Sequence, residues 1–312
     1  MKKDWVGTWF QLLEKRGIYS DVVLGSSEPG SDQITKFKKY SHAQFDGVGL
    51  VVEHFRSLGQ SPVVPTLPKI YYGSWLTKAF GLFACLRFVP VFGAHWKAIS
   101  PPALISGRED IFVYQILSAE AYQKIIQASR RAGVSVNSQL LWSLDQCLRN
   151  EWVSGSGPFF WMLPINMRCA SQNISDTSNH ASWIWVDTLN VLTATDIQKQ
   201  IQARLKEGFH WGAWISINIG KLIGIKGMNF LLNQAEKIEE RWIGTFSNMG
   251  VWNIDAGPLV VIVPTAPTTP LSVGCITVNN RMGLSLNIRL NLKVEKSQLQ
   301  AWLESWIKKA GD

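Results

Sequence analysis

The sequence predicts an α/β fold in which helices pack on a mixed β-sheet, a two-layer sandwich. Two observations predict it. Strand-like apolar runs alternate with amphipathic helical patterns along the chain, and 46% of the 312 residues are hydrophobic while 17% are charged. That length and balance allow a sizeable buried core in one large domain or two ordinary ones, which excludes intrinsic disorder. The Gly and Pro residues follow no period, so a collagen-like or low-complexity chain is excluded as well.

The sequence of the N-terminal third of the chain predicts few helices and strands. An amphipathic helix covers 4–17, a polar turn region covers 25–32, a short strand covers 34–41 and a helix covers 47–58. The Pro-rich stretch 62–68 and the aromatic segment 70–106 then form a long crossover with one or two helices. We therefore divide the chain into a shortened N-terminal half (1–65), a crossover (66–107) and a C-terminal half (108–312).

The C-terminal half is more regular. Its predicted strands cover 111–117, 158–167, 182–186, 243–248 and 259–264, followed by a hairpin of 273–280 with 284–291 around Asn280 to Gly283. Its predicted helices cover 118–133, 138–150, 195–219, 228–241 and 296–309. We expect Ser118, Asn137 and Thr195 at the starts of the first three helices, because hydroxyl and amide side chains cap helix N-termini.

The formal net charge is +8, which suits an anionic partner such as nucleic acid, a membrane surface or a phosphorylated cofactor. The basic residues are mostly scattered, with their densest cluster at Lys36, Lys38 and Lys39, and they form no Arg-rich stripe. This distribution argues against a nucleic-acid partner.

Cysteine usage and hydropathy indicate a cytoplasmic protein. Cys85, Cys147, Cys169 and Cys275 form no C-x-x-C pair, so we expect them reduced and mostly buried. Polar residues interrupt the N-terminal apolar stretch, which therefore predicts an amphipathic helix rather than a signal peptide. The most apolar stretch, 80–93, is too short to span a bilayer and contains Arg87 and Pro90.

Motif searches exclude several chemistries. The sequence has no G-x-x-x-x-G-K-[ST], no G-x-G-x-x-G after a strand, no H-E-x-x-H and no G-x-S-x-G. The five histidines have no paired spacing, so we expect no metal site.

One element does point to chemistry, the H-x-x-x-D-G of residues 42–47, between a strand and a helix. A histidine at a strand end can act as a general base near neutral pH. Asp46 can fix the loop through an arginine or backbone N–H groups, and Gly47 lets the backbone pass closely. The alternative is purely structural: Asp46 caps the following helix, and His42 is an ordinary half-buried side chain.

Further segments carry a family resemblance. Residues 128–137 (ASRRAGVSVN), followed by Leu140-Leu141, resemble the family pattern A-R-x-x-G-V-T-V-N-x-x-L-L. Residues 163–168 (LPINMR), 179–182 (NHAS) and 245–250 (TFSNMG) resemble P-V-N-L-R, G-N-x-x-S and x-x-S-N-x-G. From about residue 34 to 310 the chain resembles the chloramphenicol acetyltransferase-like superfamily, which includes CoA-dependent acyltransferases, condensation domains and wax ester synthase/diacylglycerol acyltransferases.

The sequence also departs from that superfamily. Only 41 residues precede His42, which implies a truncated N-terminal half. The single histidine, preceded by Ser41, is closer to the acyl-CoA enzymes than to condensation domains, which usually have two. The plant-type D-F-G-W-G element is not evident, and residues 253–257 (NIDAG) are a loose match to it.

The resemblance implies acyl transfer from a CoA or carrier-protein thioester to a hydroxyl or amine. In that role His42 is the general base, and Asp46 is structural, points away from the tunnel and pairs with Arg168. Thr245, Ser247 and Asn248 then bind substrate and hold the oxyanion, although Ser-Asn-x-Gly is also ordinary turn chemistry. Acyl-CoA would be a co-substrate, with no bound cofactor, and the +8 charge is consistent with binding its phosphates.

The sequence leaves two points open, namely whether the protein catalyses a reaction and whether it needs a partner. The competing function is a shortened, non-catalytic homologue that binds a ligand or partner; the shortened N-terminal half favours it, and the intact site residues oppose it. A short N-terminal half would expose Trp5, Trp9, Val51 and Phe55, so a homo-oligomer or a second chain could complete the tunnel. The alternative to such an association is a monomer in which the helix at 4–17 and the aromatic crossover cover the gap. The aromatic stretch 80–96 also offers a peripheral membrane contact.

Overall fold

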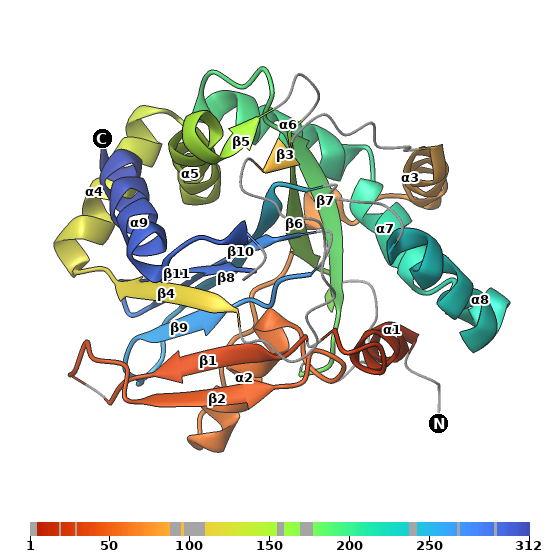
Figure 1. Ribbon diagram of the computed structural model, residues 1–312, viewed down its shortest axis with the longest axis horizontal. Helices are drawn as coiled ribbons and strands as arrows, with labels where there is room; N and C mark the ends of the chain where they lie inside the picture. Colours follow the sequence, from red (N-terminus) through yellow and green to blue (C-terminus); the bar gives the residue numbers. More distant parts are fainter. Residues whose placement is uncertain are drawn as a thin grey trace.

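The structure is a computed structural model of the chain (Figure 1). It describes residues 5–18, 20–28, 30–87, 95–96, 110–154, 159–168, 177–236, 242–266, 269–289 and 292–312. The predicted α/β fold of helices and mixed sheets is confirmed. Parts of the predicted crossover, at 88–94 and 97–109, lie outside the described residues, as do Cys169 and the end of the predicted helix 228–241.

A six-stranded mixed sheet forms the centre of the molecule. Its strands in spatial order are β4 (Ile111–Ile116), β11 (Arg281–Ile288), β10 (Leu271–Val278), β8 (Gly244–Trp252), β6 (Phe160–Asn166) and β7 (Ala181–Asp187). The β8 strand runs parallel to both β10 and β6, and the other neighbours are antiparallel. All eight residues of β10 are buried, because this strand is covered on both faces.

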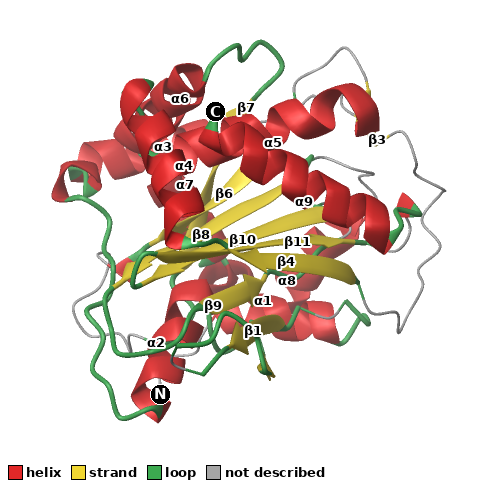
Figure 2. Ribbon diagram, turned by 90° about the vertical axis from the view of Figure 1, so that its left-hand side faces the viewer, coloured by secondary structure: helices red, strands yellow, loops and turns green. Residues whose placement is uncertain are grey.

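Four helices cover one face of this sheet, as Figure 2 shows. They are α4 (Ala119–Arg131), α5 (Val136–Trp152), α6 (Ala194–Lys206) and α9 (Lys296–Gly311). Large aromatic side chains fill the space between the layers: Trp161 of β6 and Trp306 of α9 are fully buried, and Trp306 packs edge-on against Phe246 of β8. Much of the unusual Trp content therefore serves the core.

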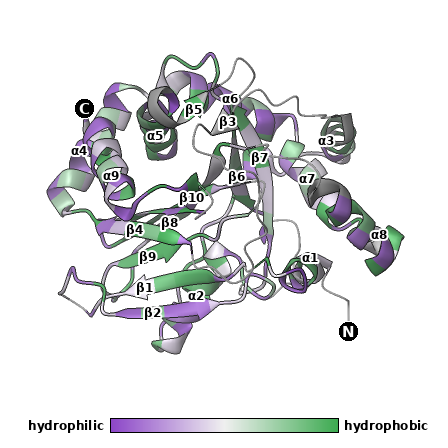
Figure 3. Ribbon diagram, in the orientation of Figure 1, coloured by the Kyte–Doolittle hydropathy of each residue, from purple (hydrophilic) through white to green (hydrophobic). Residues whose placement is uncertain are grey.

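The other face carries a small three-stranded sheet and one helix. Strand β9 (Leu259–Ile262) pairs with β1 (Val22–Ser26), which pairs with β2 (Lys36–Tyr40), and α2 (Gly47–Ser57) follows. Strand β9 crosses β10 and β11 closely: Ser285 and Asn287 of β11 donate to the carbonyls of Val261 and Val263 at 2.6 and 2.8 Å. The lysines of β2 give it the hydrophilic colour in Figure 3 and protect it as an edge strand.

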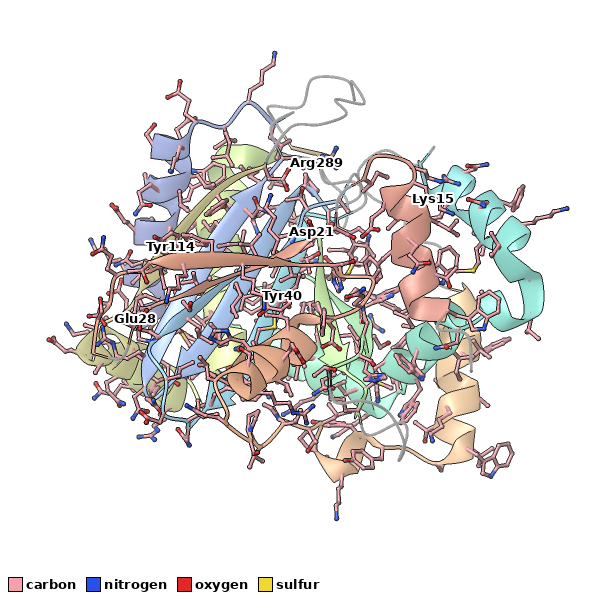
Figure 4. All side chains as sticks on the ribbon, turned by 90° about the horizontal axis from the view of Figure 1, so that it is seen from below. Lys15, Asp21, Glu28, Tyr40, Tyr114 and Arg289 are labelled. Atoms are coloured by element: carbon pink, nitrogen blue, oxygen red, sulfur yellow. The ribbon has the colours of Figure 1, made fainter. Side chains whose placement is uncertain are left out.

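The remaining helices lie on the side of the molecule away from α4 and α9 (Figure 1). They are α1 (Trp5–Glu14), α3 (Trp75–Arg87), α7 (Phe209–Ile217) and α8 (Gly220–Glu236), which is kinked at Gly224. Figure 4, from below, shows α1 between the sheets and α8, with Lys15 beside α8. Trp9 of α1 connects this helix to the end of α7, because its indole N–H donates to the Ile217 carbonyl at 2.6 Å. Three short elements complete the list: a 3₁₀ helix (Lys69–Tyr71) and the paired strands β3 (His95–Trp96) and β5 (Val153–Ser154).

Two predicted helix caps are wrong. Ser135, not Asn137, caps α5, and its hydroxyl accepts from the backbone N–H of Ser138. Thr193, not Thr195, caps α6 in a capping box with Asp196. The helix predicted to run to about 219 is interrupted at Gly208, whose φ of 79° ends α6 before α7 begins.

The remaining differences concern turns and exposure. The predicted turn at 25–32 begins inside β1, and the hairpin of β10 and β11 turns at Asn279 and Asn280, whose φ angles of 47° and 61° are those of a type I′ turn. Val51 and Phe55 are fully buried rather than exposed. Of the described cysteines Cys275 is buried, whereas Cys85 and Cys147 are only half-buried.

Within the described part of the chain, no single helix has the length and apolar composition needed to cross a membrane. Helix α7 and residues 222–233 of α8 reach that length and composition only as a pair, and they meet at a bend of 100°.

Candidate active site

A cavity of about 510 Å³ opens where two central strands separate. Strands β6 and β8 pair only at Trp161 with Gly244 and Met162 with Thr245, and β6 then continues alongside β7 alone. Pro164, two residues beyond the last pair, has no N–H to give to a ladder. The residues that follow the last pair on both strands therefore border a gap, and Pro164, Ser247 and Met249 line the cavity there.

The H-x-x-x-D-G loop enters this gap. Strand β2 ends at Tyr40 and α2 begins at Gly47, so His42 lies on the short connection between them and lines the cavity. Its ring stacks on Phe10 of α1, with ring centroids 4.2 Å apart and planes 15° apart. This stacking fixes the plane of the imidazole.

Two polar groups approach Nδ1 of His42. The carbonyl oxygen of Phe45 lies 3.0 Å away and can only accept, which favours a proton on Nδ1. Asn179 Nδ2, a donor, lies 3.0 Å from the same nitrogen and also donates to the His42 carbonyl at 2.8 Å. In the tautomer with its proton on Nδ1, Nε2 holds a lone pair, which is what a general base requires.

Burial also favours the neutral imidazole. It lowers the pKa of His42 below its usual value, and the negative charge of Asp46 raises that pKa by a smaller amount. At neutral pH His42 is therefore unprotonated and can accept a proton.

Asp46 is surrounded by donors. One carboxylate oxygen accepts from the backbone N–H of Gly49 at 2.6 Å and from Arg168 Nη2 at 2.8 Å; the other accepts from the N–H of His180 at 2.7 Å and from Arg168 Nη1 at 2.9 Å. The structure thus brings Asp46 and Arg168 together as a bidentate ion pair, with the two side chains only 4% and 7% exposed. The hydrogen bond from Gly49 also makes Asp46 the N-cap of α2. Asp46 therefore caps this helix and pairs with an arginine at the same time.

Arg168 connects this ion pair to the end of β6. Its Nη1 also donates to Asn166 Oδ1 at 3.1 Å, and its Nη2 donates to the Ser178 carbonyl at 2.9 Å. The close backbone approach expected at Gly47 occurs at Gly49 instead. A Cβ on Gly49 would overlap the Thr177 carbonyl, whereas one on Gly47 would meet the flexible side chain of Met249.

The side chains of β8 alternate between the two faces of the sheet. Thr245 and Ser247 are buried and line the cavity. Asn248 does not line it: the side chain is exposed, and its Nδ2 donates to Asn137 Oδ1 of α5 at 3.2 Å. The structure therefore removes Asn248 from the expected oxyanion donors, because it lies on the helix-covered face.

Several polar cavity residues were not singled out as functional from the sequence, among them Asn179 and Ser20. Asn179, which orients His42, lies in the quoted NHAS segment, so its place in that motif is a usable signal. Ser20 precedes β1, and among the described residues its buried hydroxyl has no hydrogen-bond partner. No sequence pattern marks Ser20.

Most of the remaining cavity wall is apolar, apart from hydroxyl side chains at Ser182, Ser216, Thr265 and Thr269. It comes from α1 (Val6, Trp9, Phe10, Leu13), from α7 and α8 (Ala213, Ile217, Leu231) and from Trp183 of β7, and no Lys or Arg is among the described lining residues. Nor do the described His, Cys, Asp and Glu side chains form a group of three that could hold a metal ion. The cavity suits an uncharged, apolar molecule that meets a few polar groups around His42.

Solved structures of similar fold are numerous. The epimerization domain of the third module of tyrocidine synthetase B matches at a TM-score of 0.53 and 13% identity, over 88% of this chain and 67% of that one. The trichothecene 15-O-acetyltransferase from Fusarium sporotrichioides matches at 0.50 and 14%, over 100% and 75%. The wax ester synthase/diacylglycerol acyltransferase from Marinobacter aquaeolei VT8 matches at 0.52 and 12%, over 88% and 66%.

The sequence comparisons are negative, since no family model and no curated protein matches the chain. The chain also spans only part of its structural neighbours, for example 59% of the EpoB cyclization-docking bidomain from Sorangium cellulosum. The match in fold nevertheless extends over most of this chain. The chain has the fold of the CoA-dependent acyltransferase (condensation-domain) superfamily.

Proposed function

We propose that this protein is an acyltransferase that moves an acyl group from a thioester to a hydroxyl or amine acceptor. The single observation that carries the proposal is the position of His42, which lines an apolar cavity with Nδ1 3.0 Å from the Phe45 carbonyl oxygen. The structural neighbours that are acyltransferases by name support the same class of reaction.

In the proposed mechanism, Nε2 of His42 takes the proton of the acceptor as the acceptor oxygen or nitrogen attacks the thioester carbonyl carbon. A tetrahedral oxyanion forms, then collapses with cleavage of the carbon–sulfur bond, and the protonated His42 gives its proton to the leaving thiolate. The hydroxyl groups of Thr245 and Ser247, which line the cavity, would donate hydrogen bonds to the oxyanion. Asp46 and Arg168 hold the loop that carries His42.

The donor is a CoA or carrier-protein thioester that acts as a co-substrate. Because no Lys or Arg is among the described lining residues, the cavity itself takes the acyl chain and the acceptor. The phosphates of such a donor would bind outside it. An alcohol or amine with a substantial apolar part fits the remaining wall.

The proposal is tested by thiol release from acyl-CoA donors of increasing chain length, with an apolar alcohol as acceptor. We expect release by the wild-type protein and a loss of at least about 10²-fold in His42→Ala, because proton transfer contributes that much. His54→Ala is the matched control: His54 lies on α2, outside the cavity lining, and should leave turnover unchanged. Equal rates in the two variants would contradict the proposal.

The second candidate is a ligand-binding protein without turnover. The cavity favours it in one respect, since no Lys or Arg is among its described lining residues to bind a thioester's phosphates. The same assay separates the two functions. A wild-type protein that binds a fatty acyl ligand, measured by Trp fluorescence, but releases no thiol with any donor would support the second candidate.

A further inference from the structure

Large exposed apolar side chains gather on three neighbouring helices, α3, α7 and α8. On α8, Leu222 is 86% exposed and Phe230 is 61% exposed; on α3, Trp75 is 74% exposed. The others on these helices are Leu76, Phe80, Phe83, Ile215, Ile223, Ile225 and Leu231. Helix α3 packs on α7, α7 leads into α8, and α8 projects from the body of the molecule (Figure 1). We call the exposed residues of these helices the apolar face; monomeric proteins rarely expose so many together.

The opposite side of α8 is already occupied. Met228 and Leu232 are buried against Trp5, Trp9 and Leu12 of α1. The apolar face is therefore not the packing surface of α8 within this chain, and its exposure has another cause.

The helices that carry this face have basic residues and almost no acidic ones. Residues 75–87 of α3 and 208–235, which span α7 and most of α8, contain no Asp or Glu, and Glu236 ends α8. Their basic residues are Lys78 and Arg87 in α3 and Lys221 and Lys226 in α8. The sequence of these helices therefore has a net positive charge, which complements an anionic surface.

The apolar face also reaches the cavity. Leu231 is 41% exposed on α8 and lines the cavity as well. Ala213 and Ile217 of α7 line it from the same side. An acyl chain at the apolar face can thus pass beside Leu231 into the cavity along apolar side chains.

We propose that the apolar face docks this protein on an anionic lipid bilayer, with α7 and α8 lying in the interface. An amphipathic surface that combines apolar residues with lysines binds such an interface through both area and charge. The 100° bend between the two helices suits a position along the surface. The further step, that a lipid substrate enters beside Leu231, rests on the proposed function; the docking does not.

The docking is tested by sedimentation of the full chain with vesicles of phosphatidylcholine, with and without 30% phosphatidylglycerol. Leu222→Ser/Phe230→Ser should lower the partition coefficient at least about tenfold, because each side chain loses apolar burial. Leu192→Ser/Val251→Ser is the matched control, with equally exposed apolar residues outside the face. It should bind like the wild type.

Charge is tested by the same measurement. Lys226→Glu should weaken binding to the anionic vesicles about tenfold or more, and 1 M salt should remove most of that difference. Lys308→Glu, on α9 at the far side of the molecule, makes the same charge change and should have little effect.

Several results would overturn the docking. These are wild-type protein that stays in solution with anionic vesicles, or equal partition of the Leu222/Phe230 variant and its control. A third such result would come from light scattering without vesicles. If the wild-type protein is a dimer and the Leu222→Ser/Phe230→Ser variant is a monomer, the apolar face binds a second copy of the chain instead. His42→Ala should bind vesicles like the wild type, so a failure of acyl transfer leaves this test intact.

Discussion

Replacing Asp46 with Asn should destabilise the protein strongly, because the change leaves a buried arginine without its counter-charge. The Asp46 and Arg168 side chains are 4% and 7% exposed, and the carboxylate accepts four hydrogen bonds. Breaking a buried ion pair by removing one partner costs about 3–5 kcal/mol. At roughly 2 °C per kcal/mol for a chain of this size, the melting temperature should fall by about 6–10 °C.

The assay is urea unfolding of Asp46→Asn, Arg168→Gln and the double variant, followed by Trp fluorescence. Because the double variant leaves no uncompensated charge, its loss should be clearly smaller than the two single losses added together. Glu28→Gln is the control: Glu28 pairs with Lys36 at 2.8 Å, but both side chains are mostly exposed, so the loss should stay below about 1 kcal/mol.

Two results would refute this reasoning. One is an Asp46→Asn variant within about 1 kcal/mol of the wild type; the other is a double variant whose loss equals the sum of the single losses. A kinetic result would refute the structural role specifically. If Asp46 relayed protons, Asp46→Asn would abolish turnover at every pH, whereas a structural Asp46 leaves activity in the folded fraction.

The remaining predictions concern the cavity. Ser247→Ala should lower turnover about 10²-fold if its hydroxyl meets the oxyanion, whereas Asn248→Ala, on the other face of β8, should change it less than a few-fold. Because burial lowers the pKa of His42, the acid limb of the pH–rate profile should have its midpoint below 6.5. Below pH 6.5 the unfolded chain then binds more protons at His42 than the native chain does. The free energy of unfolding should therefore fall as the pH drops below 6.5, and it should fall less in the His42→Gln variant. Asn179→Leu should lower kcat with little change in melting temperature, because it frees the His42 loop.

Local chemistry predicted most of the elements. Ser118 begins α4 as expected, with its hydroxyl accepting from the Ala121 N–H at 3.1 Å, and the helix predicted at 47–58 is α2. These features depend on neighbours within a few residues, which the sequence displays directly. Ser135 and Thr193 were missed as caps because Asn137 and Thr195, two residues later, are equally good capping residues by type.

Features set by distant contacts could not be predicted in this way. Strand β1 includes Gly25 and Ser26, which indicate a turn, yet they pair with β2 on one side and β9 on the other. The side of the sheet that Asn248 faces could not be predicted either. The predicted strand covers 243–248, whereas β8 continues to Trp252. The alternation of its side chains places Ser247 rather than Asn248 in the cavity.

The position of His42 depends on a junction of four segments that are far apart in the sequence. Asp46 at the start of α2 bonds His180, which precedes β7, and Arg168, which lies two residues beyond the end of β6. Asn166 at the end of β6 donates to the Pro65 carbonyl. These bonds lie beyond the last pair of β6 with β8, where no ladder holds the strands. A buried charge network therefore takes over from the sheet at this point and keeps the gap open. The candidate base is held over the cavity by contacts that no local spacing encodes.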